Sequence, residues 1–322
     1  MVSALPDVHG LARAGRHDRF PDAPRKTLRR GTRPMKRLAL VTALLLSSTA
    51  AQAQLASKIT TYDPAKTRVA KAVHEGAGSM NFGSLMDIKT FSTNFIFLHR
   101  GILQPKSGIG QHFHNHCEEM FVILDGEAEF TINGRTSTLK GPAGAPNRMG
   151  ASHGIYNATD KPVEWMNINV GTSKVYDAFN LGDDRVGASK DAIPQFITMK
   201  LDKALLKPAA TGTGVTRRRV LGPSIFFSPW AYYDHVMIAP NGSTVSTTSS
   251  DISEAYYVIS GDGSVTVNGE TVAIKKGDAI PVDIGQSKSF KGGSAPLELM
   301  IIGVAKDMET KKAFLAVAAN AQ

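Results

Sequence analysis

The sequence predicts an all-β fold of two tandem barrels followed by a short C-terminal helix. Short apolar and β-branched runs recur at even spacing between turns, and helical periodicity is rare, which is typical of sandwiches and closed barrels. The pattern occurs twice. With 322 residues, 42% of them apolar and 20% charged, the chain is long enough for two ordinary globular domains.

The first series of strands is expected between residues 90 and 170. Its apolar runs cover residues 95–103, 120–124, 128–132 and 163–170. Turn-forming pairs separate these runs, including Asp125-Gly126, Asn133-Gly134 and Gly141-Pro142. Such pairs favour tight connections between strands, so this region is predicted to form one barrel.

A second series repeats the first, with runs at 232–238, 255–259, 264–267, 271–274 and 297–304. Two nine-residue segments, 118–126 and 253–261, correspond to each other. Their sequences are Glu-Glu-Met-Phe-Val-Ile-Leu-Asp-Gly and Ser-Glu-Ala-Tyr-Tyr-Val-Ile-Ser-Gly, and an Asn-Gly turn follows each. Internal repetition indicates duplicated units. We therefore divide the mature chain into a barrel at 54–175, a linker at 176–210, a second barrel at 211–306 and a tail at 307–322. The linker contains a helix-like stretch at 199–207, and the tail a helix at 311–319.

The N-terminal region has the features of a secretory leader that begins at Met35. Two basic residues precede an apolar stretch at 38–46, and Ala51-Gln52-Ala53 has the small residues of a cleavage site. We expect a signal peptide at 35–53, cleavage after Ala53, and a periplasmic or secreted protein. Residues 1–34 are then a non-native upstream extension. No later run approaches the roughly 20 apolar residues of a membrane span.

The positive charge does not indicate a nucleic-acid partner. Of the formal +9, residues 1–53 contribute +7, from ten Lys or Arg against three Asp or Glu, which leaves 27 basic and 25 acidic residues elsewhere. The arginine run 217–219 is therefore interpreted as a solvated or inter-domain face rather than a phosphate-binding stripe. The single cysteine, Cys117, excludes an internal disulfide, and we interpret it as a small semi-buried side chain.

One motif in the first unit carries the chemistry. His112 and His114 are two residues apart, so on a strand both face the same side. Glu119 follows on the next strand, and His153 comes after a Gly/Pro-rich turn in a position to complete the set. Imidazoles and one carboxylate suit a single divalent transition metal ion, namely Fe, Mn, Ni, Cu, Co or Zn. Three neutral ligands and one anion leave such an ion open to further ligands, which is typical of a catalytic site.

These residues resemble the two motifs of the cupin superfamily. His112-x-His114-x4-Glu119-x6-Gly is followed by Gly-x2-His153-x3-Asn, and the duplicated layout resembles bicupins. The resemblance covers residues 90–170 strongly and 215–305 more weakly, and Arg148 stands where proline is usual. It implies double-stranded β-helix barrels, also called jelly rolls, with His112, His114, Glu119 and His153 as metal ligands.

Neighbouring residues are candidates for catalysis and for the pocket. His116 is a candidate proton carrier or alternative ligand, with a solvent-facing loop histidine as the alternative reading, and Glu119 could act as general base. Phe121 and Ile123 share the phase of Glu119 along the strand and are expected to line an apolar pocket, although core packing explains them equally well. Further pocket candidates are Tyr156, Asn157, Trp165, Asn167 and Asn169.

The second unit is predicted to be a degenerate cupin barrel without metal. By spacing, the ligand positions correspond to Thr247, Ser249, Glu254 and Lys288. Hydroxyls and an ammonium cannot replace neutral imidazoles at a transition-metal site. We expect Lys288 to pair with Glu254 inside the barrel.

The resemblance implies a protein that binds or converts a small molecule, because cupins include dioxygenases, decarboxylases, isomerases, lyases and sugar-binding proteins. We favour a metal-dependent oxygenase similar to quercetinases. The alternatives are a Lewis-acid isomerase, lyase or hydrolase at the same metal, and a non-catalytic module that binds a sugar or another small molecule. Oxalate decarboxylase-like chemistry is disfavoured because the strand after Gly126 lacks the arginine that this resemblance implies. Barrel edges are able to pair subunits, so a homo-oligomer stays open.

Overall fold

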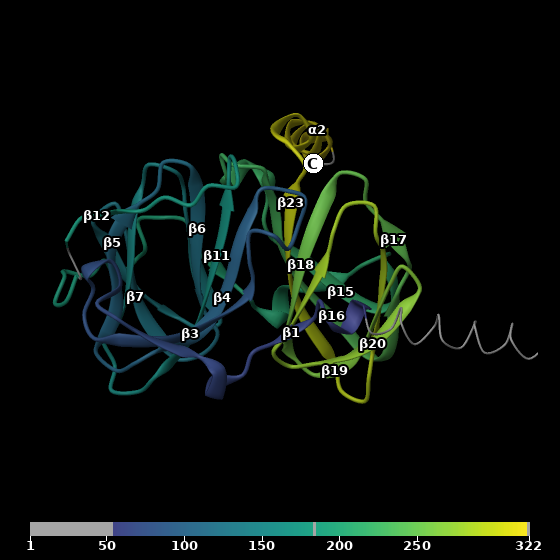
Figure 1. The fold of residues 1–322 in the computed structure, drawn as a ribbon, viewed down its shortest axis with the longest axis horizontal. Helices are drawn as coiled ribbons and strands as arrows, with labels where there is room; N and C mark the ends of the chain where they lie inside the picture. The colour runs from purple at the N-terminus through teal and green to yellow at the C-terminus, as the bar shows by residue number, and fades with distance from the viewer. Residues whose placement is uncertain (1–53, 183–184, 321–322) are drawn as a thin grey trace, which may run out of the picture. The chain divides into compact units, whose positions relative to one another are not determined.

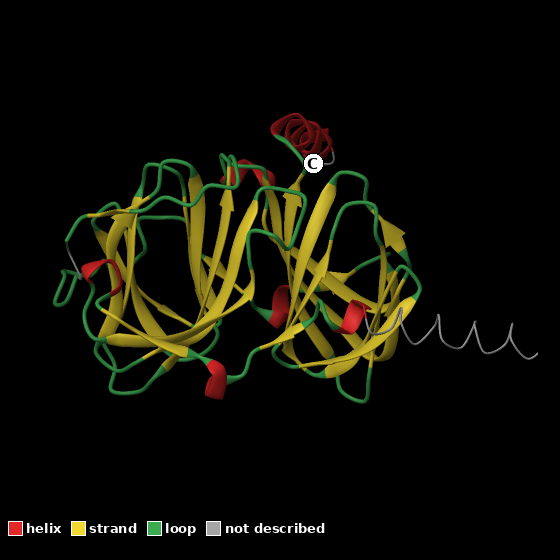
Figure 2. Cartoon of the chain, viewed as in Figure 1, coloured by secondary structure: helices red, strands yellow, loops and turns green. Residues whose placement is uncertain are grey.

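The computed structural model describes residues 54–182 and 185–320. The predicted upstream extension at 1–34 and the predicted signal peptide at 35–53 lie outside the described residues. Within the described part, strands dominate and helical segments are few and short (Figure 2). The all-β prediction is confirmed. No helix in this part is long and apolar enough to cross a membrane.

The first barrel consists of two antiparallel sheets. Its strands are β2 (Arg68–Lys71), β3 (Ser79–Met86), β4 (Phe95–Leu103), β5 (Ser107–Phe113), β6 (Cys117–Ile123), β7 (Glu127–Ile132), β8 (Arg135–Lys140), β9 (Ala143–Asn147), β10 (Ser152–Asn157), β11 (Val163–Gly171), β12 (Phe179–Asn180) and β13 (Met199–Lys200). One sheet has the order β12-β5-β10-β7-β8, and the other β13-β9-β6-β11-β4-β3-β2. The two sheets curl around a core that includes Ile109, Phe130 and Ile155 (Figure 1).

The second barrel is one continuous eleven-stranded sheet. Its strands are β1 (Thr60–Thr61), β14 (Lys207–Pro208), β15 (Gly212–Leu221), β16 (Trp230–Thr244), β17 (Thr247–Thr248), β18 (Ile252–Ser260), β19 (Asp262–Val267), β20 (Glu270–Lys275), β21 (Asp278–Val282), β22 (Ser287–Gly292) and β23 (Leu297–Ala305). The main order is β1-β21-β18-β23-β16-β22-β19-β20, with β15 on β16, β14 on β15 and β17 on β22.

The repeat seen in the sequence is also present in the turns. Asn133 and Gly134 join β7 to β8 with φ values of 48° and 77°, and Asn268 and Gly269 join β19 to β20 with 49° and 83°. Positive φ at both central positions is the geometry that Asn-Gly pairs favour in two-residue hairpins. Both predicted turns are confirmed, in equivalent places of the two barrels.

Residues 55–62 pack on the second barrel, although the sequence places them at the start of the first. β1 pairs with β21, and Leu55 lies in the core of the second barrel. The Leu55 amide donates to Glu270 Oε2 at 3.0 Å, and the Tyr62 amide donates to the Gly277 carbonyl at 3.0 Å. The edge of β21 offers unpaired backbone groups, and this segment satisfies them.

The helix-like stretch predicted at 199–207 is not an α-helix. It contains β13, the 3-10 turn η3 (Lys203–Leu205) and the start of β14. Met199 pairs with Gly144 of β9, and Met199 and Leu201 are buried in the apolar core, so tertiary pairing outweighs the local apolar spacing. The helix predicted in the tail is confirmed as α2 (Met308–Asn320). The other 3-10 turns are η1 (Pro64–Lys66), η2 (Val73–Glu75) and η4 (Pro223–Ile225).

Side chains of both barrels share one apolar core cluster, which includes Phe95 and Met120 of the first and Trp230 of the second. Polar contacts add to it. The buried Glu118 carboxylate accepts from the amides of Phe227 and Ser228 at 2.8 and 2.7 Å. Arg148, which occupies the usual proline position, donates from Nε to the Ile225 carbonyl at 2.6 Å.

The arginine run at 217–219 lies partly at the surface, as the sequence indicates, since the side chains of Arg217 and Arg219 are 30% and 39% exposed, but it also binds a buried carboxylate. On β15 its side chains alternate, and Arg217 and Arg219 both bind Asp234, whose side chain is fully buried in the second barrel. Arg218, between them, donates to the Lys200 carbonyl at 3.3 Å. The run therefore supplies two partners for a buried carboxylate, because strand alternation sends its first and last members to the same side.

Candidate metal centre

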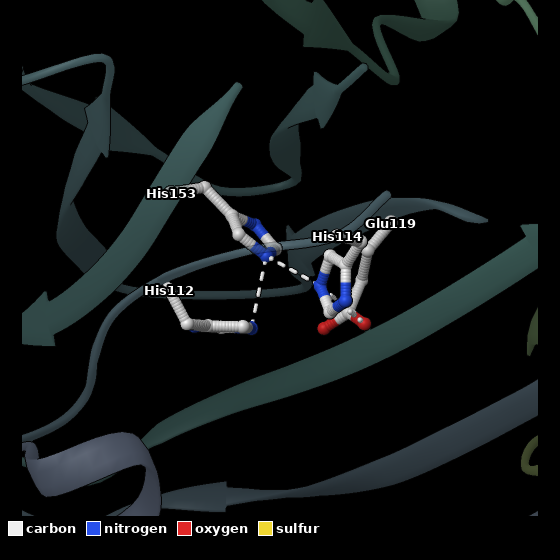
Figure 3. Close-up of side chains that lie close together, drawn as sticks. All are labelled: His112, His114, Glu119 and His153. Carbon is white, nitrogen blue, oxygen red and sulfur yellow. Dashed lines mark hydrogen bonds and ion pairs between the residues drawn. The ribbon is translucent and has the colours of Figure 1, made fainter. Parts of the chain in front are cut away.

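Three strands of the first barrel bring the four motif residues together. His112 lies on β5, His114 directly follows it, Glu119 is on β6 and His153 is on β10, where it is the cross-strand partner of His112. All four side chains are buried, and their ligand atoms lie within 4.8 Å of one another. The His153 Nε2 atom is 3.0 Å from His112 Nε2 and 3.1 Å from His114 Nε2 (Figure 3).

The protonation of these imidazoles follows from their other nitrogens. His112 Nδ1 lies 2.9 Å from the Gly110 carbonyl, and His114 Nδ1 is bonded to the Asp177 carbonyl. A carbonyl only accepts, so both Nδ1 atoms carry a proton, which leaves the Nε2 atoms as the positions available to a metal ion. Burial lowers the pKa of His112 to about 2 and that of His153 well below its usual value. Converging lone pairs repel unless a cation lies between them.

The donor set therefore fits a divalent transition metal ion. Glu119 Oε2 is 3.3 Å from His114 Nε2 and adds the one anionic donor. Three imidazoles and a carboxylate are the ligands that Mn, Fe, Co, Ni, Cu and Zn prefer. The predicted cofactor, one divalent transition metal ion held by the first barrel, agrees with this geometry.

Two asparagines of β11 hold the carboxylate of Glu119. Asn167 Nδ2 donates to Oε1 at 2.7 Å, and Asn169 Nδ2 donates to Oε2 at 2.8 Å. Both amides face the site because residues two apart on a strand share a side. Donors to each oxygen fix the orientation of the carboxylate, which favours a ligand role. A general-base role for Glu119 stays a prediction.

The segment after β11 supports His114 from the outside of the site. Asp177 accepts from His114 Nδ1 with its backbone carbonyl and from the amides of Asn115 and His116 with its carboxylate, at 2.9 and 3.1 Å. Sequence reasoning assigned this segment to a linker, because no local pattern distinguishes Asp177. The His116 side chain is exposed and lies outside the cluster. Its predicted role as proton carrier or alternative ligand remains untested.

A second unpredicted residue, His74, stacks on His112 with ring centroids 3.7 Å apart. Its φ of 49° places η2 against β5, and a Cβ on Gly110 would lie 2.1 Å from the His74 carbonyl oxygen. Glycine at 110 therefore permits this close approach. His74 Nδ1 also lies 2.7 Å from Asn180 Oδ1 on β12, so the stack is fixed from both sides.

Glu119 opens onto a cavity of about 410 Å³ in the first barrel. Its walls are mainly apolar and aromatic, with a few polar groups. The lining residues are Val73, His74, Met80, Phe82, Asp87, Ile88, Ile96, Phe97, His99, Ile109, Glu119, Trp165, Asn167 and Tyr176. Among the described residues that line it, none is Lys or Arg. A volume of this size suits a small organic molecule.

The remaining predicted pocket residues have different positions. Phe121 stacks on His153 with centroids 4.6 Å apart, and Ile123 is fully buried in the core. Tyr156 and Asn157 are buried but do not line the cavity, and the Asn157 amide caps a loop by donating to the Lys161 carbonyl at 2.7 Å. Strand alternation alone could not assign these faces, because β10 has a bulge between His153 and Ile155.

Cys117 is buried and accepts a hydrogen bond from Asn169 Nδ2 at 3.4 Å. Burial raises the pKa of its thiol to about 12, so a thiolate is disfavoured. This environment agrees with the interpretation of Cys117 as a small apolar side chain, although it is fully rather than partly buried.

In the second barrel the predicted ion pair is confirmed. Lys288 Nζ lies 2.7 Å from Glu254 Oε2, and Thr247 is the cross-strand partner of Lys288, as His112 is of His153. The hydroxyls of Tyr232 and Tyr256 donate to the two oxygens of Glu254 at 2.5 and 2.7 Å. The hydroxyl of Ser249 instead accepts hydrogen bonds from the backbone amides of Asp251 and Ile252 in its own turn.

Comparisons with known proteins agree with this geometry. The family model of the cupin domain matches residues 99–169 and again 234–303. No curated protein sequence matches the chain significantly. Among solved structures, salicylate 1,2-dioxygenase from Pseudaminobacter salicylatoxidans is similar, with a TM-score of 0.52, 16% identity, and coverage of 71% of this chain and 74% of that one.

Two oxalate decarboxylases are similar to about the same degree. The enzyme from Bacillus subtilis gives a TM-score of 0.55 at 17% identity over 77% of this chain and 76% of its own, and a structure of it describes Mn(II) centres. The formate complex of the enzyme from Lactobacillus farciminis gives a TM-score of 0.56 at 14% sequence identity. The match covers 77% of this chain and 86% of that one. At such identities the likeness concerns the fold. With two cupin-domain matches, two barrels and a His/Glu metal site in the first, the chain belongs to the cupin superfamily as a bicupin.

Proposed function

We propose that this bicupin is a metal-dependent dioxygenase that acts on a small aromatic molecule carrying oxygen donors. The observation that carries the proposal is the cavity above Glu119, whose lining is aromatic and, among the described residues, free of Lys and Arg. The charged groups of that lining are the acids Asp87 and Glu119. A small dicarboxylate such as oxalate needs cationic partners along its length, and this cavity offers none besides the metal end.

The cavity wall is arranged for a flat ring. Phe97 stacks on His99 with centroids 4.1 Å apart, and Tyr176 lies beside Phe97 at 5.6 Å. The ring of Phe82 is tilted against that of His99, with centroids 5.3 Å apart. Aromatic rings in such a row favour planar apolar ligands through offset or edge contacts.

His99 supplies a polar group away from the metal. It faces Asn167 across the β4–β11 ladder, and no hydrogen-bond partner for its ring nitrogens is found in the described part of the chain. Burial and the charge of Arg68 lower its pKa to about 4, so the ring is neutral near pH 7. A neutral imidazole both donates and accepts, which suits a hydroxyl or carbonyl substituent on the substrate.

When bound, the ion would supply Lewis acidity and redox chemistry to a substrate held through its oxygens. The chain's own residues do the rest. Asn167 and Asn169 keep Glu119 oriented, the aromatic wall positions the ring and excludes water, and His99 fixes the far substituent. In a dioxygenation, both atoms of one O₂ enter the product and no external reductant is consumed.

The test is oxygen uptake with a panel of catechols, salicylates and flavonols, after elemental analysis of the purified protein. We expect consumption of one O₂ per substrate, with a product mass raised by two oxygen atoms for catechols and salicylates, and by two oxygen atoms less one released carbon monoxide for flavonols. Product formation without oxygen uptake would favour the Lewis-acid isomerase, lyase or hydrolase. Tight binding of panel members without turnover would favour the non-catalytic binding module.

We also propose that the protein is exported, on the basis of the leader at 35–53 alone. Mass spectrometry of the natural protein from periplasmic or secreted fractions should find Gln54 as the N-terminus. A natural protein that retains residues upstream of Ala53 in the cytoplasm would contradict export.

A further inference from the structure

The second barrel contains a network of charged side chains that the metal chemistry does not use. Arg217 Nε and Arg219 Nε donate to Asp234 at 2.7 and 2.5 Å, and Lys288 pairs with Glu254. Asp234 is fully buried, Glu254 and Lys288 are 7% and 12% exposed as side chains, and the arginines 30% and 39%. Buried charges are costly, and a barrel that had only lost its metal could be filled by apolar residues instead.

The charges of this network do not balance. Three cations face two carboxylates, which leaves one excess positive charge. Arg217 uses Nε and Nη2 on Asp234, and no partner for its Nη1 is found among the described residues. Lys288 has three N–H groups and one carboxylate partner. Donors and charge for one more anion are therefore available.

Arg217 and Lys288 both line a cavity of about 110 Å³ inside this barrel. Glu254 and Tyr256 also line it, and much of the rest of the wall is apolar, including Val236 and Leu299. The cavity has the volume of about four waters at roughly 30 Å³ each, which suits a molecule of a few heavy atoms. Its position corresponds to that of the metal site, because Thr247 and Lys288 pair as His112 and His153 do.

We propose that this cavity binds a small monocarboxylate, with Arg217 and Lys288 as its cationic partners. One excess charge matches a monoanion, and a dianion would leave a buried charge unpaired. The planar guanidinium matches a carboxylate, and the apolar wall accommodates a short aliphatic tail of about two to four carbons. Lys288 then provides the fixed cation of the second barrel, at the ladder position equivalent to that of His153.

The test is calorimetric titration of the full-length metal-loaded protein with butyrate and with its neutral analogue butyramide, at constant ionic strength. We expect butyrate to bind and butyramide not to bind. Arg217→Gln should weaken butyrate binding by about tenfold or more, because a hydrogen bond to a charged group is lost. The matched control is Arg218→Gln, which removes the neighbouring arginine and should leave butyrate binding unchanged.

The first barrel must be excluded as the site. The same titration with His112→Ala/His153→Ala, which removes the metal ligands, should still show butyrate binding. Loss of binding in that variant, equal binding of butyrate and butyramide, or equal effects of Arg217→Gln and Arg218→Gln would each overturn the proposal. If Arg217→Gln does not fold, methyl NMR of the unaltered protein decides. Butyrate must shift the methyl signals of Val236 and Leu299, and absent shifts would refute the site.

Discussion

In the first barrel, His112 and His153 are partners across β5 and β10, and in the second, Thr247 and Lys288 are partners across β17 and β22. A glutamate lies beside each pair, and both of its oxygens accept hydrogen bonds, from amides at Glu119 and from hydroxyls and an ammonium at Glu254. What differs is the source of positive charge. The first barrel needs an ion from outside, whereas the second carries Lys288.

In each of the two barrels, the buried glutamate lies beside a cation or a site for one. Three imidazoles whose Nε2 atoms converge beside one carboxylate form a site that is incomplete without an ion. Lys288 completes the other site within the chain, so Glu254 has a charged partner without an ion from outside. Variants that remove the metal ligands of the first barrel or Lys288 of the second test this comparison.

The largest effect is expected from His112→Ala/His153→Ala. Two of four ligands are lost, so bound metal should fall from about one ion per chain to a trace. Elemental analysis measures the content, and circular dichroism checks that both barrels remain folded. Unchanged metal content in the double variant would show that the ion lies elsewhere.

Removal of Lys288, the fixed cation of the second barrel, should lower the free energy of unfolding and leave the metal content unchanged. Lys288→Met leaves Glu254 buried without its charged partner, and breaking such a pair costs about 3–5 kcal/mol, with the lower end expected here because two tyrosine hydroxyls still bind the carboxylate. Urea unfolding at pH 7 measures the loss.

Two further variants control this measurement. Lys288→Met/Glu254→Gln removes both charges and should recover most of the stability. Lys306→Met breaks a pair with Asp251 whose side chains are both 46% exposed, and should change little. Equal effects of Lys288→Met and Lys306→Met would show that the buried pair has no special role.

A smaller effect on the metal side is expected from Asn169→Ala. The metal ligands remain, but Glu119 loses the donor to Oε2 and with it part of its orientation. Loss of a hydrogen-bond partner of a metal ligand typically weakens metal binding by about 10- to 100-fold. Competition with a chelator measures the affinity. Asn81→Ala, whose carbonyl oxygen accepts from Gln104 in the same barrel, is the control and should retain the metal; equal losses in both variants would exclude the proposed support.

The sequence predicts the metal ligands and the ion pair of the second barrel, but not the residues that support the metal site. Strand alternation predicts that His112 and His114 share a side, and the resemblance to the cupin motifs implies the full ligand set with Glu119 and His153. The internal repeat gives the correspondence of Lys288 with His153, because ladder positions repeat with the fold. The residues that support the site were not accessible in this way. Asp177 lies in the irregular segment after β11 and His74 in the 3-10 turn η2, and neither position carries a periodic signal.

The fold shows the same limit. The strands and Asn-Gly hairpins follow from local patterns, and the first barrel's strand at 95–103 has the predicted bounds. Residues 55–62 and 199–207 differ from prediction because their structure depends on partners elsewhere, on β21 and on β9. The pairing of Arg217 and Arg219 with the buried Asp234 likewise depends on the neighbouring strand, which no charge count along the sequence reveals.

The smallest expected effect concerns the acid stability that the Lys288–Glu254 pair gives the second barrel. Burial would raise the pKa of Glu254, but the charge and hydrogen bond of Lys288 outweigh it and hold that pKa below its usual value of 4.5. A carboxyl whose pKa is lower in the folded state stabilises the protein above its unfolded pKa, and this contribution is lost as the pH falls through the folded pKa. Urea midpoints from pH 7 to pH 3 should therefore decline more steeply for the unaltered protein than for Lys288→Met/Glu254→Gln. Parallel curves would mean that the pair contributes nothing to acid sensitivity, and the second barrel's fixed cation would then be a neighbour of Glu254 rather than its stabilising partner.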